Sequence, residues 1–465
     1  MNLFQQLFDQ YNEFHVSDLA VNRFSAKEFH KVLLPLTKEF EFTHIGNSVE
    51  GQPIHSIKLG NGPIKILLWS QMHGNESTAT RAILDILQFM GQPNELKIHQ
   101  QQLLEKLTIC IVPMLNPDGT DRFQRRNALN IDINRDARQF EAPESKVLKA
   151  IIEDFKADFA FNLHDQRRFY NITGTNKPST IAFLSPAYDA LQGINNARKN
   201  AMQLIALLRG ALETIIQGQV GLYNDAFTPR AFGDFCQATG TSTILVESGW
   251  QSNDMEKEFV RKLNFCLLIS AFSAIANNRQ LDFTIENYQS IPMNGECLFD
   301  VLLRNVLIPT AEANYKTDIG IHHTEVSIKH SSRYYADGVV TDIGDLTDFY
   351  GFNEPACANL IVQPGMVWPE EIGGMADLSH AQATEMLKQG YLFVIMQDVG
   401  HAPYIDLPIN AVAKDFVADI IPVFEGKANF VLKNAAGEIT FVMINGFLWN
   451  VEEPLPININ GLTLN

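Results

Sequence analysis

Between about residues 43 and 280, short apolar runs alternate with segments of helical periodicity, and this alternation limits the fold more than any other feature. The runs expected to form strands are 53–59, 64–69, 107–112, 159–163 and 243–246. The helical segments between them are 79–90, 145–155 and 197–216. Strands separated by helices are typical of an α/β layer with a parallel or mixed sheet.

The two flanking regions have other patterns. Residues 1–42 place Leu3, Leu7 and Tyr11 at helical spacing, and Ser25 with Glu28 forms a capping-box candidate. Residues 1–44 are therefore expected to be an N-terminal helical extension, ahead of a catalytic domain at 45–280. From 281 to 465 glycine and proline are frequent and β-like runs dominate, which predicts a β-rich accessory domain.

Composition excludes some classes of partner. The 465 residues suggest two or three domains at roughly 150 residues each, and 46% are hydrophobic, enough for a large core. A net charge of −17 argues against nucleic acid and anionic membranes as partners. The start of the chain lacks a basic targeting segment, and the five cysteines are scattered without a C-x-x-C pair. These features predict a cytoplasmic protein with reduced thiols.

Polar residues gather where four of the expected strands end. They are Met72-His73-Gly74-Asn75-Glu76, Asn116-Pro117-Asp118-Gly119, His164-Asp165 and Glu247-Ser248-Gly249. Open α/β sheets bind ligands beyond the carboxyl ends of their strands, so these four segments are expected to lie around one site.

His73 and Glu76 are three residues apart, so in a turn entering a helix both can bind one ion. His164 is the candidate third ligand, which would leave a position open for water as in catalytic zinc sites. Glu247 follows four apolar residues and is the candidate base. Taken singly, each residue also has an ordinary explanation, such as a core histidine or a surface turn. The hypothesis rests on their joint occurrence at strand ends.

Taken in order, these segments resemble the zinc carboxypeptidase family over roughly residues 45–280. The matching residues are His73-Gly74-Asn75-Glu76, Asn116-Pro117-Asp118-Gly119, Arg125-Arg126-Asn127, Asp132-Ile133-Asn134-Arg135, His164 and Glu247. The resemblance implies an α/β fold with a mixed eight-stranded sheet and one zinc ion per chain. The absence of a visible leader makes the chain look like the bacterial or cytoplasmic members.

The resemblance also implies a role for each matching residue. Zinc would be bound by His73, Glu76 and His164, and Asp132 would hold the His73 ring. Arg125, with Arg126 as the fallback, would stabilise the oxyanion, and Glu247 would be the general acid/base. Asn134 and Arg135 would bind the carboxylate of the substrate, and Tyr223 would be the family's mobile tyrosine.

The expected function is zinc-dependent hydrolysis of a peptide or amide bond near a free carboxylate. One alternative is a deacylase of N-acyl amino acids, similar to aspartoacylase and succinylglutamate desuccinylase, which use a similar His, Glu, His core. A second is a non-catalytic peptide-binding module, which would predict loss of a ligand or of the base. Asp165 and Gln166 stand where digestive carboxypeptidases carry a small hydroxyl residue, so the substrate side of the cleft is expected to differ. A homo-oligomer is also compatible with the sequence.

Overall fold

The computed structural model describes residues 3–92, 94–328, 333–398, 402–418, 422–456 and 459–464. The chain divides into two compact units, Met1–Glu296 and Cys297–Asn465. The expected boundary at 280/281 is therefore wrong. Helix α10 (Ile285–Gln289) packs against α7 (Asn196–Leu212), and β10 (Asn294–Glu296) pairs with β6 (Tyr170–Ile172), so the chain leaves the first unit only after Glu296.

The first unit is built on a sheet of eight strands in the order β1-β2-β4-β3-β5-β9-β7-β8. The strands are β1 (Glu41–Asn47), β2 (Pro53–Leu59), β3 (Ile64–Trp69), β4 (Leu107–Val112), β5 (Phe159–Asp165), β7 (Ile181–Leu184), β8 (Val220–Leu222) and β9 (Ser242–Ser248). The central strands β4, β3, β5 and β9 run parallel, whereas β1, β2 and β7 introduce antiparallel pairs. The predicted mixed eight-stranded sheet is confirmed.

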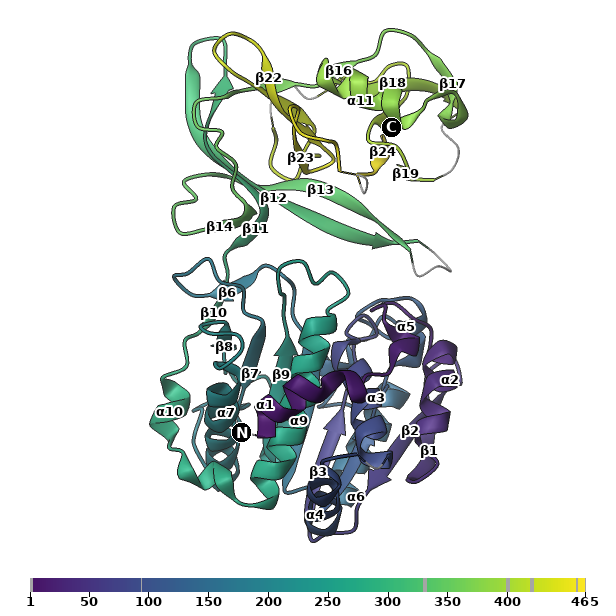
Figure 1. Ribbon diagram of the computed structural model, residues 1–465, viewed down its shortest axis with the longest axis vertical. Helices are drawn as coiled ribbons and strands as arrows, with labels where there is room; N and C mark the ends of the chain where they lie inside the picture. Colours follow the sequence, from purple (N-terminus) through teal and green to yellow (C-terminus); the bar gives the residue numbers. More distant parts are fainter. Residues whose placement is uncertain are drawn as a thin grey trace. The chain divides into compact units, whose positions relative to one another are not determined.

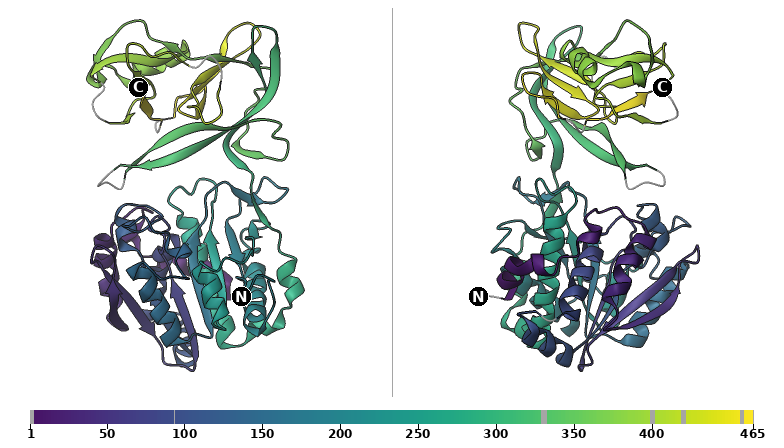
Figure 2. Two further views of the ribbon diagram at one scale, coloured as in Figure 1. Left: turned by 180° about the vertical axis from the view of Figure 1, so that it is seen from behind. Right: turned by 45° about the vertical axis from the view of Figure 1, so that its right-hand side comes forward.

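Strand alternation sends apolar side chains into two cores, one on each face of this sheet. In β3, Ile66 and Leu68 join the core under α3 and α9, whereas Leu67 and Trp69 join the core under α6 and α8. Helices cover both faces (Figures 1 and 2). Among the helices of the unit are α3 (Thr78–Gly91), α4 (Lys97–Lys106), α5 (Pro117–Asp121), α6 (Pro143–Phe155), α8 (Phe232–Ala238) and α9 (Glu258–Ala276).

The first 44 residues are not a separate extension. Helices α1 (Leu3–Gln10) and α2 (Ala26–Leu36) form as expected, and Ser25 and Glu28 make the predicted capping box. However, Phe4 and Leu7 are buried in the same core as α3 and α9, and β1 already begins at Glu41. Strand β1 is exposed at most positions, so it lacks the apolar alternation that would reveal a strand in the sequence.

Helix α9 is the central core helix of this unit. By length and composition it could cross a membrane, yet 83% of its most apolar window is buried inside the protein. The five cysteines are free thiols, as expected, and four of them are buried.

The second unit is rich in β-structure, as predicted. Its larger sheet has the order β13-β12-β11-β15-β21-β22-β23, with β14 beside β11, and its smaller sheet has the order β16-β18-β20-β24-β19, with β17 beside β18. The larger sheet comprises β11 (Leu298–Pro309), β12 (Asn314–Ser327), β13 (Tyr334–Gly344), β14 (Tyr350–Asn353), β15 (Ile361–Pro364), β21 (Phe430–Lys433), β22 (Ile439–Ile444) and β23 (Phe447–Asn450). The smaller sheet comprises β16 (Met366–Val367), β17 (Ile372–Gly374), β18 (Tyr391–Asp398), β19 (Tyr404–Ile405), β20 (Asn410–Val412) and β24 (Gly461–Leu464), and α11 (His380–Lys388) packs beside it.

Candidate metal centre

The three predicted ligands come from the carboxyl ends of two adjacent parallel strands. His73 and Glu76 lie in the turn between β3 and α3, and His164 is the sixth residue of β5. The turn fits because Gly74 has no side chain: a Cβ there would lie 2.0 Å from the backbone of Gly119. The turn that carries His73 and Glu76 thus lies directly against the backbone of α5.

Glu76 joins the two imidazole rings. Its Oε1 lies 2.8 Å from Nδ1 of His73, and its Oε2 lies 2.8 Å from Nδ1 of His164. The three residues are buried, and their candidate ligand atoms all lie within 4.8 Å of one another. Two imidazole nitrogens and one carboxylate are a donor set used by catalytic zinc sites, so these residues fit zinc.

The far side of each ring is held by a residue of the segment 132–134. Asp132 Oδ1 lies 3.1 Å from Nε2 of His73, and Asn134 Nδ2 lies 3.4 Å from Nε2 of His164. The Asp132 side chain also accepts a hydrogen bond from the backbone of Asn134. Metal-binding histidines commonly donate from the second ring nitrogen to a carboxylate, which fixes the tautomer and the ring orientation, and Asp132 can serve His73 in this way. The amide nitrogen of Asn134 can only donate, so its contact with His164 does not fill the same role.

The charges of the centre are strongly coupled. Burial acts to raise the pKa of Glu76, but the two histidines outweigh it and hold this pKa well below the ordinary value. Burial acts to lower the pKa of His73, yet Glu76 and Asp132 raise it overall. Burial lowers the pKa of His164, with His73 and Arg125 acting in the same direction. The centre is therefore built to hold carboxylates in their ionised form, as a cation site requires.

Arg125 reaches this centre and Arg126 does not. Arg125 donates from Nε to Asp132 over 3.0 Å, and its Nη1 lies 3.2 Å from Oε1 of Glu76. Arg126 donates instead to the backbone oxygen of Asn130 and is exposed. Of the two arginines considered from the sequence, Arg125 is thus the one that lies at the centre.

Asn134 and Arg135 differ in how far they are available to a substrate. Asn134 is buried, and its side-chain oxygen accepts a hydrogen bond from the backbone of Phe232. Arg135 is exposed and donates to the backbone oxygen of Asn134 over 2.7 Å. Asn134 therefore joins the start of α8 to the His164 ring, whereas Arg135 has its side chain at the surface next to the centre.

Glu247 lies on β9 directly opposite His164 in the strand register. Its Oε2 atom is buried and has no hydrogen-bond partner among the described residues. Burial, followed by the charges of Glu76 and Asp165, raises the pKa of Glu247 well above its ordinary value. A carboxylate that is costly to ionise and has one oxygen without a hydrogen-bond partner is suited to exchange a proton with a bound molecule.

Tyr223 lies just after β8, in a pair with Tyr170, and their ring centroids are 5.3 Å apart. Burial, a hydrogen bond with Tyr170 and the charge of Glu247 raise the pKa of Tyr223. Tyr170 was not singled out from the sequence, because only the pairing of β6 with β10 places it there. Lys257 was also missed, since its contacts with Asp165 and Ser248 depend on the turn before α9.

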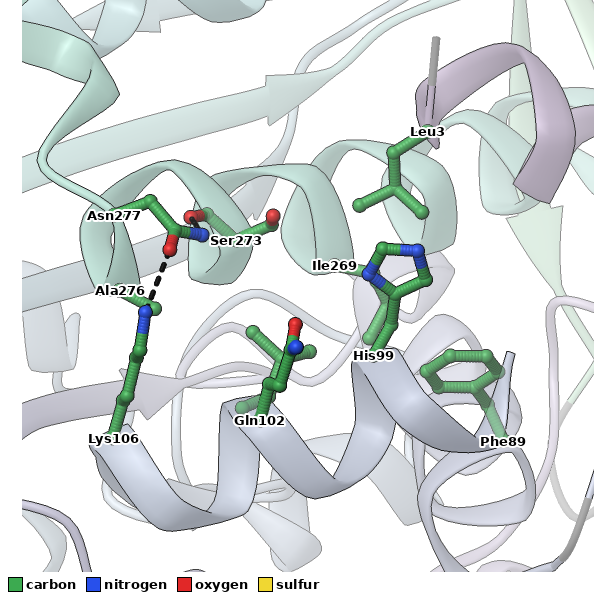
Figure 3. A pocket seen from close by; sticks show the side chains of 10 residues that line it. Leu3, Phe89, His99, Gln102, Lys106, Ile269, Ser273, Ala276 and Asn277 are labelled. Atoms are coloured by element: carbon green, nitrogen blue, oxygen red, sulfur yellow. Dashed lines mark hydrogen bonds between the residues drawn. The ribbon is translucent and has the colours of Figure 1, made fainter. Parts of the chain in front are cut away.

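Two cavities outlined by described residues lie away from the metal centre. A small one of about 10 Å³ lies among Leu3, His99, Lys106 and Ile269, where Lys106 donates to Asn277 over 2.7 Å (Figure 3). A shallow hollow of about 900 Å³ lies at the opposite edge of the sheet, near the amino ends of β3 and β4. Neither contains a predicted site residue.

Comparison with known proteins finds carboxypeptidases. Residues 38–142 match the family model described as zinc carboxypeptidase. Carboxypeptidase D of Rattus norvegicus is 31% identical over 171 residues, which cover 32% of this chain and 12% of that protein. Carboxypeptidase 2 of Trichophyton rubrum is 32% identical over 106 residues, which cover 22% of this chain and 19% of that protein. A solved metallo-carboxypeptidase from Burkholderia cenocepacia is similar over 56% of this chain and 71% of its own, with 16% identity and a TM-score of 0.46.

Residues 38–142 of the first unit therefore match the zinc carboxypeptidase family. The matched segment includes His73, Glu76, Arg125 and Asp132, and it ends before His164 and Glu247. The chain spans only 12% and 19% of the length of the two curated relatives named above.

Proposed function

We propose that this chain is a zinc-dependent carboxypeptidase that hydrolyses a peptide or amide bond next to a free carboxylate. The observation that carries the proposal is the convergence of His73, Glu76 and His164 within 4.8 Å, in a domain of the zinc carboxypeptidase family. Glu247 and Arg125 lie beside these three residues and complete the set of groups that amide hydrolysis needs.

The side chains divide the work of hydrolysis. A zinc ion held by the three ligands would supply a Lewis acid that polarises the scissile carbonyl and activates water. Glu247 would accept the proton of the attacking water on its carboxylate and pass it to the nitrogen of the leaving amine. The guanidinium of Arg125 would donate hydrogen bonds to the oxygen that becomes negative in the transition state.

Arg135 would recognise the end of the substrate. Arg135 is exposed, and it directly follows Asn134, which contacts the His164 ring. A planar guanidinium binds a carboxylate through two parallel hydrogen bonds, so it can fix a C-terminal carboxylate relative to the scissile bond. Such a contact would favour exopeptidase cleavage of peptides with a free C-terminus.

The alternatives are less well supported. The family match names zinc carboxypeptidases, so a deacylase of N-acyl amino acids is not favoured. A non-catalytic binding module would have lost a ligand or the base, and this chain retains His73, Glu76, His164 and Glu247. We also propose one zinc ion per chain and a cytoplasmic site of action, which the five free cysteines support.

The test combines metal analysis with activity. Protein purified without chelator should carry about one zinc per chain by elemental mass spectrometry, and His164→Ala should carry far less. Glu247→Gln should keep its zinc and lose about 10²- to 10⁴-fold in turnover of peptides with a free C-terminus. Unchanged turnover in Glu247→Gln would refute the assignment of the base. Turnover of N-acyl amino acids without peptide cleavage would replace the carboxypeptidase assignment by the deacylase.

A further inference from the structure

We propose that Lys257 is a positioning residue that holds Glu247 in register with the metal ligands; this rests on the proposed function. The Lys257 ammonium lies 3.2 Å from Oδ2 of Asp165 and donates to the backbone oxygen of Ser248 over 3.0 Å. Asp165 directly follows His164, and Ser248 directly follows Glu247. One ammonium thus joins the ends of the strand that carries a ligand and the strand that carries the base.

The Asp165 carboxylate also accepts a hydrogen bond from the first residue of α3. Thr78, two residues after Glu76, donates from Oγ1 to Oδ2 of Asp165 over 2.5 Å. The backbone of Asp165 donates to Glu76 over 3.2 Å. The segments that carry Glu76, His164 and Glu247 are therefore linked through Asp165 and Lys257. The ammonium of Lys257 neutralises the charge of the Asp165 carboxylate.

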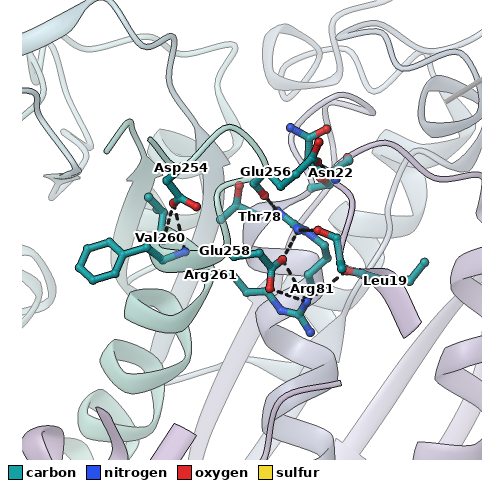
Figure 4. A network of polar contacts seen from close by, with 12 residues as sticks. Leu19, Asn22, Thr78, Arg81, Asp254, Glu256, Glu258, Val260 and Arg261 are labelled. Atoms are coloured by element: carbon teal, nitrogen blue, oxygen red, sulfur yellow. Dashed lines mark hydrogen bonds and ion pairs between the residues drawn. The ribbon is translucent and has the colours of Figure 1, made fainter. Parts of the chain in front are cut away.

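Lys257 is itself fixed by a buried polar network. It adopts a left-handed conformation, φ 53°, at the start of α9, and its backbone donates to Asp254. A non-glycine residue keeps this conformation only where its surroundings hold it. Arg81, which is fully buried, donates to the backbone oxygen of Glu256 and pairs with Glu258, so it grips both neighbours of Lys257 (Figure 4).

The N-terminal segment takes part in the same network. Arg81 donates to the backbone of Ala20, and Arg261 donates to the backbone of Leu19. The backbone of Asn22 donates to the Glu256 side chain over 2.7 Å (Figure 4). Residues 19–22 therefore support the turn that carries Lys257. Through this turn the N-terminal segment helps to position Lys257.

Loss of the Lys257 charge should affect the rate more than substrate binding. Both partners are largely buried, with 15% of the Lys257 side chain and 10% of the Asp165 side chain exposed. Asp165 Oδ1 is buried and has no hydrogen-bond partner in the described part of the chain. Without Lys257, this anion would be left uncompensated beside Glu247, and the ends of β5 and β9 would shift. A displacement of about 1 Å can cost about 10²-fold in rate.

The experiment compares Lys257→Met, Lys257→Arg and a matched control, Lys262→Met, on the same helix. Each protein is assayed for kcat and KM with a peptide bearing a free C-terminus, for zinc per chain and for thermal midpoint. Lys257→Met should lose about 10- to 100-fold in kcat with KM within about twofold and zinc retained, and Lys257→Arg should recover most of the rate. Lys262→Met should keep the kcat, KM and zinc content of the parent, with a lower thermal midpoint because its ammonium lies 3.6 Å from the centroid of the Phe8 ring.

The route through Asp165 is tested by a double-mutant cycle. If Lys257 acts through Asp165, the Lys257→Met change should cost less than about threefold in kcat when Asp165→Asn is already present. Additive effects would overturn this route. Should Lys257→Met fail to fold, Lys257→Gln against Lys257→Arg makes the same comparison.

The result also separates this inference from the proposed function. A normal kcat in folded, zinc-loaded Lys257→Met would overturn the role of Lys257, even with Glu247→Gln inactive. If the parent cleaves no peptide, the proposed function fails, and Lys257 is then judged by the visible spectrum of the Co²⁺-substituted protein. An altered spectrum in Lys257→Met that Lys257→Arg restores supports positioning, and identical spectra overturn it.

Discussion

Asp132 lies 3.1 Å from Nε2 of His73, on the side of the ring away from Glu76. A carboxylate at Nε2 keeps the proton on that nitrogen and leaves the lone pair of Nδ1 directed at the ligand cluster. The hydrogen bond and charge of His73, together with Arg125, outweigh burial and hold the pKa of Asp132 below its ordinary value. Asp132 is thus ionised at neutral pH and selects the ring form that can bind zinc.

Removal of this carboxylate should weaken metal binding. We expect Asp132→Ala to lose about 10- to 100-fold in zinc affinity, measured by competition with a chromophoric chelator, because the His73 ring loses its orientation. Asp132→Asn should lose less, since an amide oxygen can still accept from Nε2. Asp154→Ala, at an exposed aspartate of α6, serves as the control. Equal affinities for Asp132→Ala and the parent would contradict the role of Asp132.

The two neighbouring arginines should differ sharply in their effect on turnover. Arg125 contacts Glu76 and Asp132, whereas Arg126 contacts the backbone of Asn130. We expect Arg125→Ala to lose about 10²- to 10³-fold in kcat, as when one oxyanion donor is removed, with Arg126→Ala close to the parent. Steady-state kinetics on one peptide substrate measures both. A larger loss in Arg126→Ala would reverse the assignment.

The clustering of the three candidate ligands could be predicted from the sequence because topology alone brings them together. His73, Glu76 and His164 follow apolar runs that form the adjacent parallel strands β3 and β5, so their strand ends meet at one edge of the sheet. The eight-stranded sheet followed from the same alternation. In these cases the local pattern and the tertiary structure agree, which makes prediction from sequence effective.

Other features depend on contacts that local pattern does not encode. Strand β10 reads Asn-Gly-Glu, a sequence with little strand propensity, and it is extended because it pairs with β6. Arg125 and Arg126 are adjacent in sequence, and only the fold of the loop decides which one reaches Glu76. The contacts of Lys257 with Asp165 and Ser248 depend on the fold, because Asp165 lies far from it in the chain and Ser248 lies on the other side of the turn before α9.

His55, in the first unit, should make stability depend on pH. Burial, then the neighbouring His30 and His44, lowers the pKa of His55 to about 4. The unfolded value is about 6.5, so between these values the unfolded chain binds the extra proton and stability falls as the pH is lowered. His55→Gln should flatten the curve of thermal midpoint against pH in this window, whereas His99→Gln, at an exposed site, should leave it unchanged. Parallel curves for His55→Gln and the parent would contradict this account.

The buried pair of Asp85 and Arg261 should be far more important for stability than an exposed pair of the same charges. Both side chains are fully buried, and Arg261 binds Asp85 through Nη2 at 2.6 Å and Nε at 2.8 Å. Asp85 also accepts from the Tyr11 hydroxyl and from the backbone of Val16, so it fastens the N-terminal segment to α3 and α9.

We therefore expect Asp85→Ala to destabilise the first unit by about 3–5 kcal/mol, because Arg261 would remain buried with only the partly exposed Glu258, 3.3 Å from its Nη1, as a counter-ion. The matched control is Asp282→Ala, which breaks the pair with Arg279, where 69% of the arginine and 56% of the aspartate side chain are exposed. That change should cost no more than about 1 kcal/mol. Denaturant unfolding of both variants measures the difference. A similar cost at the two sites would mean that solvent reaches Arg261 once Asp85 is removed, and that the network around Arg81 is looser than its contacts indicate.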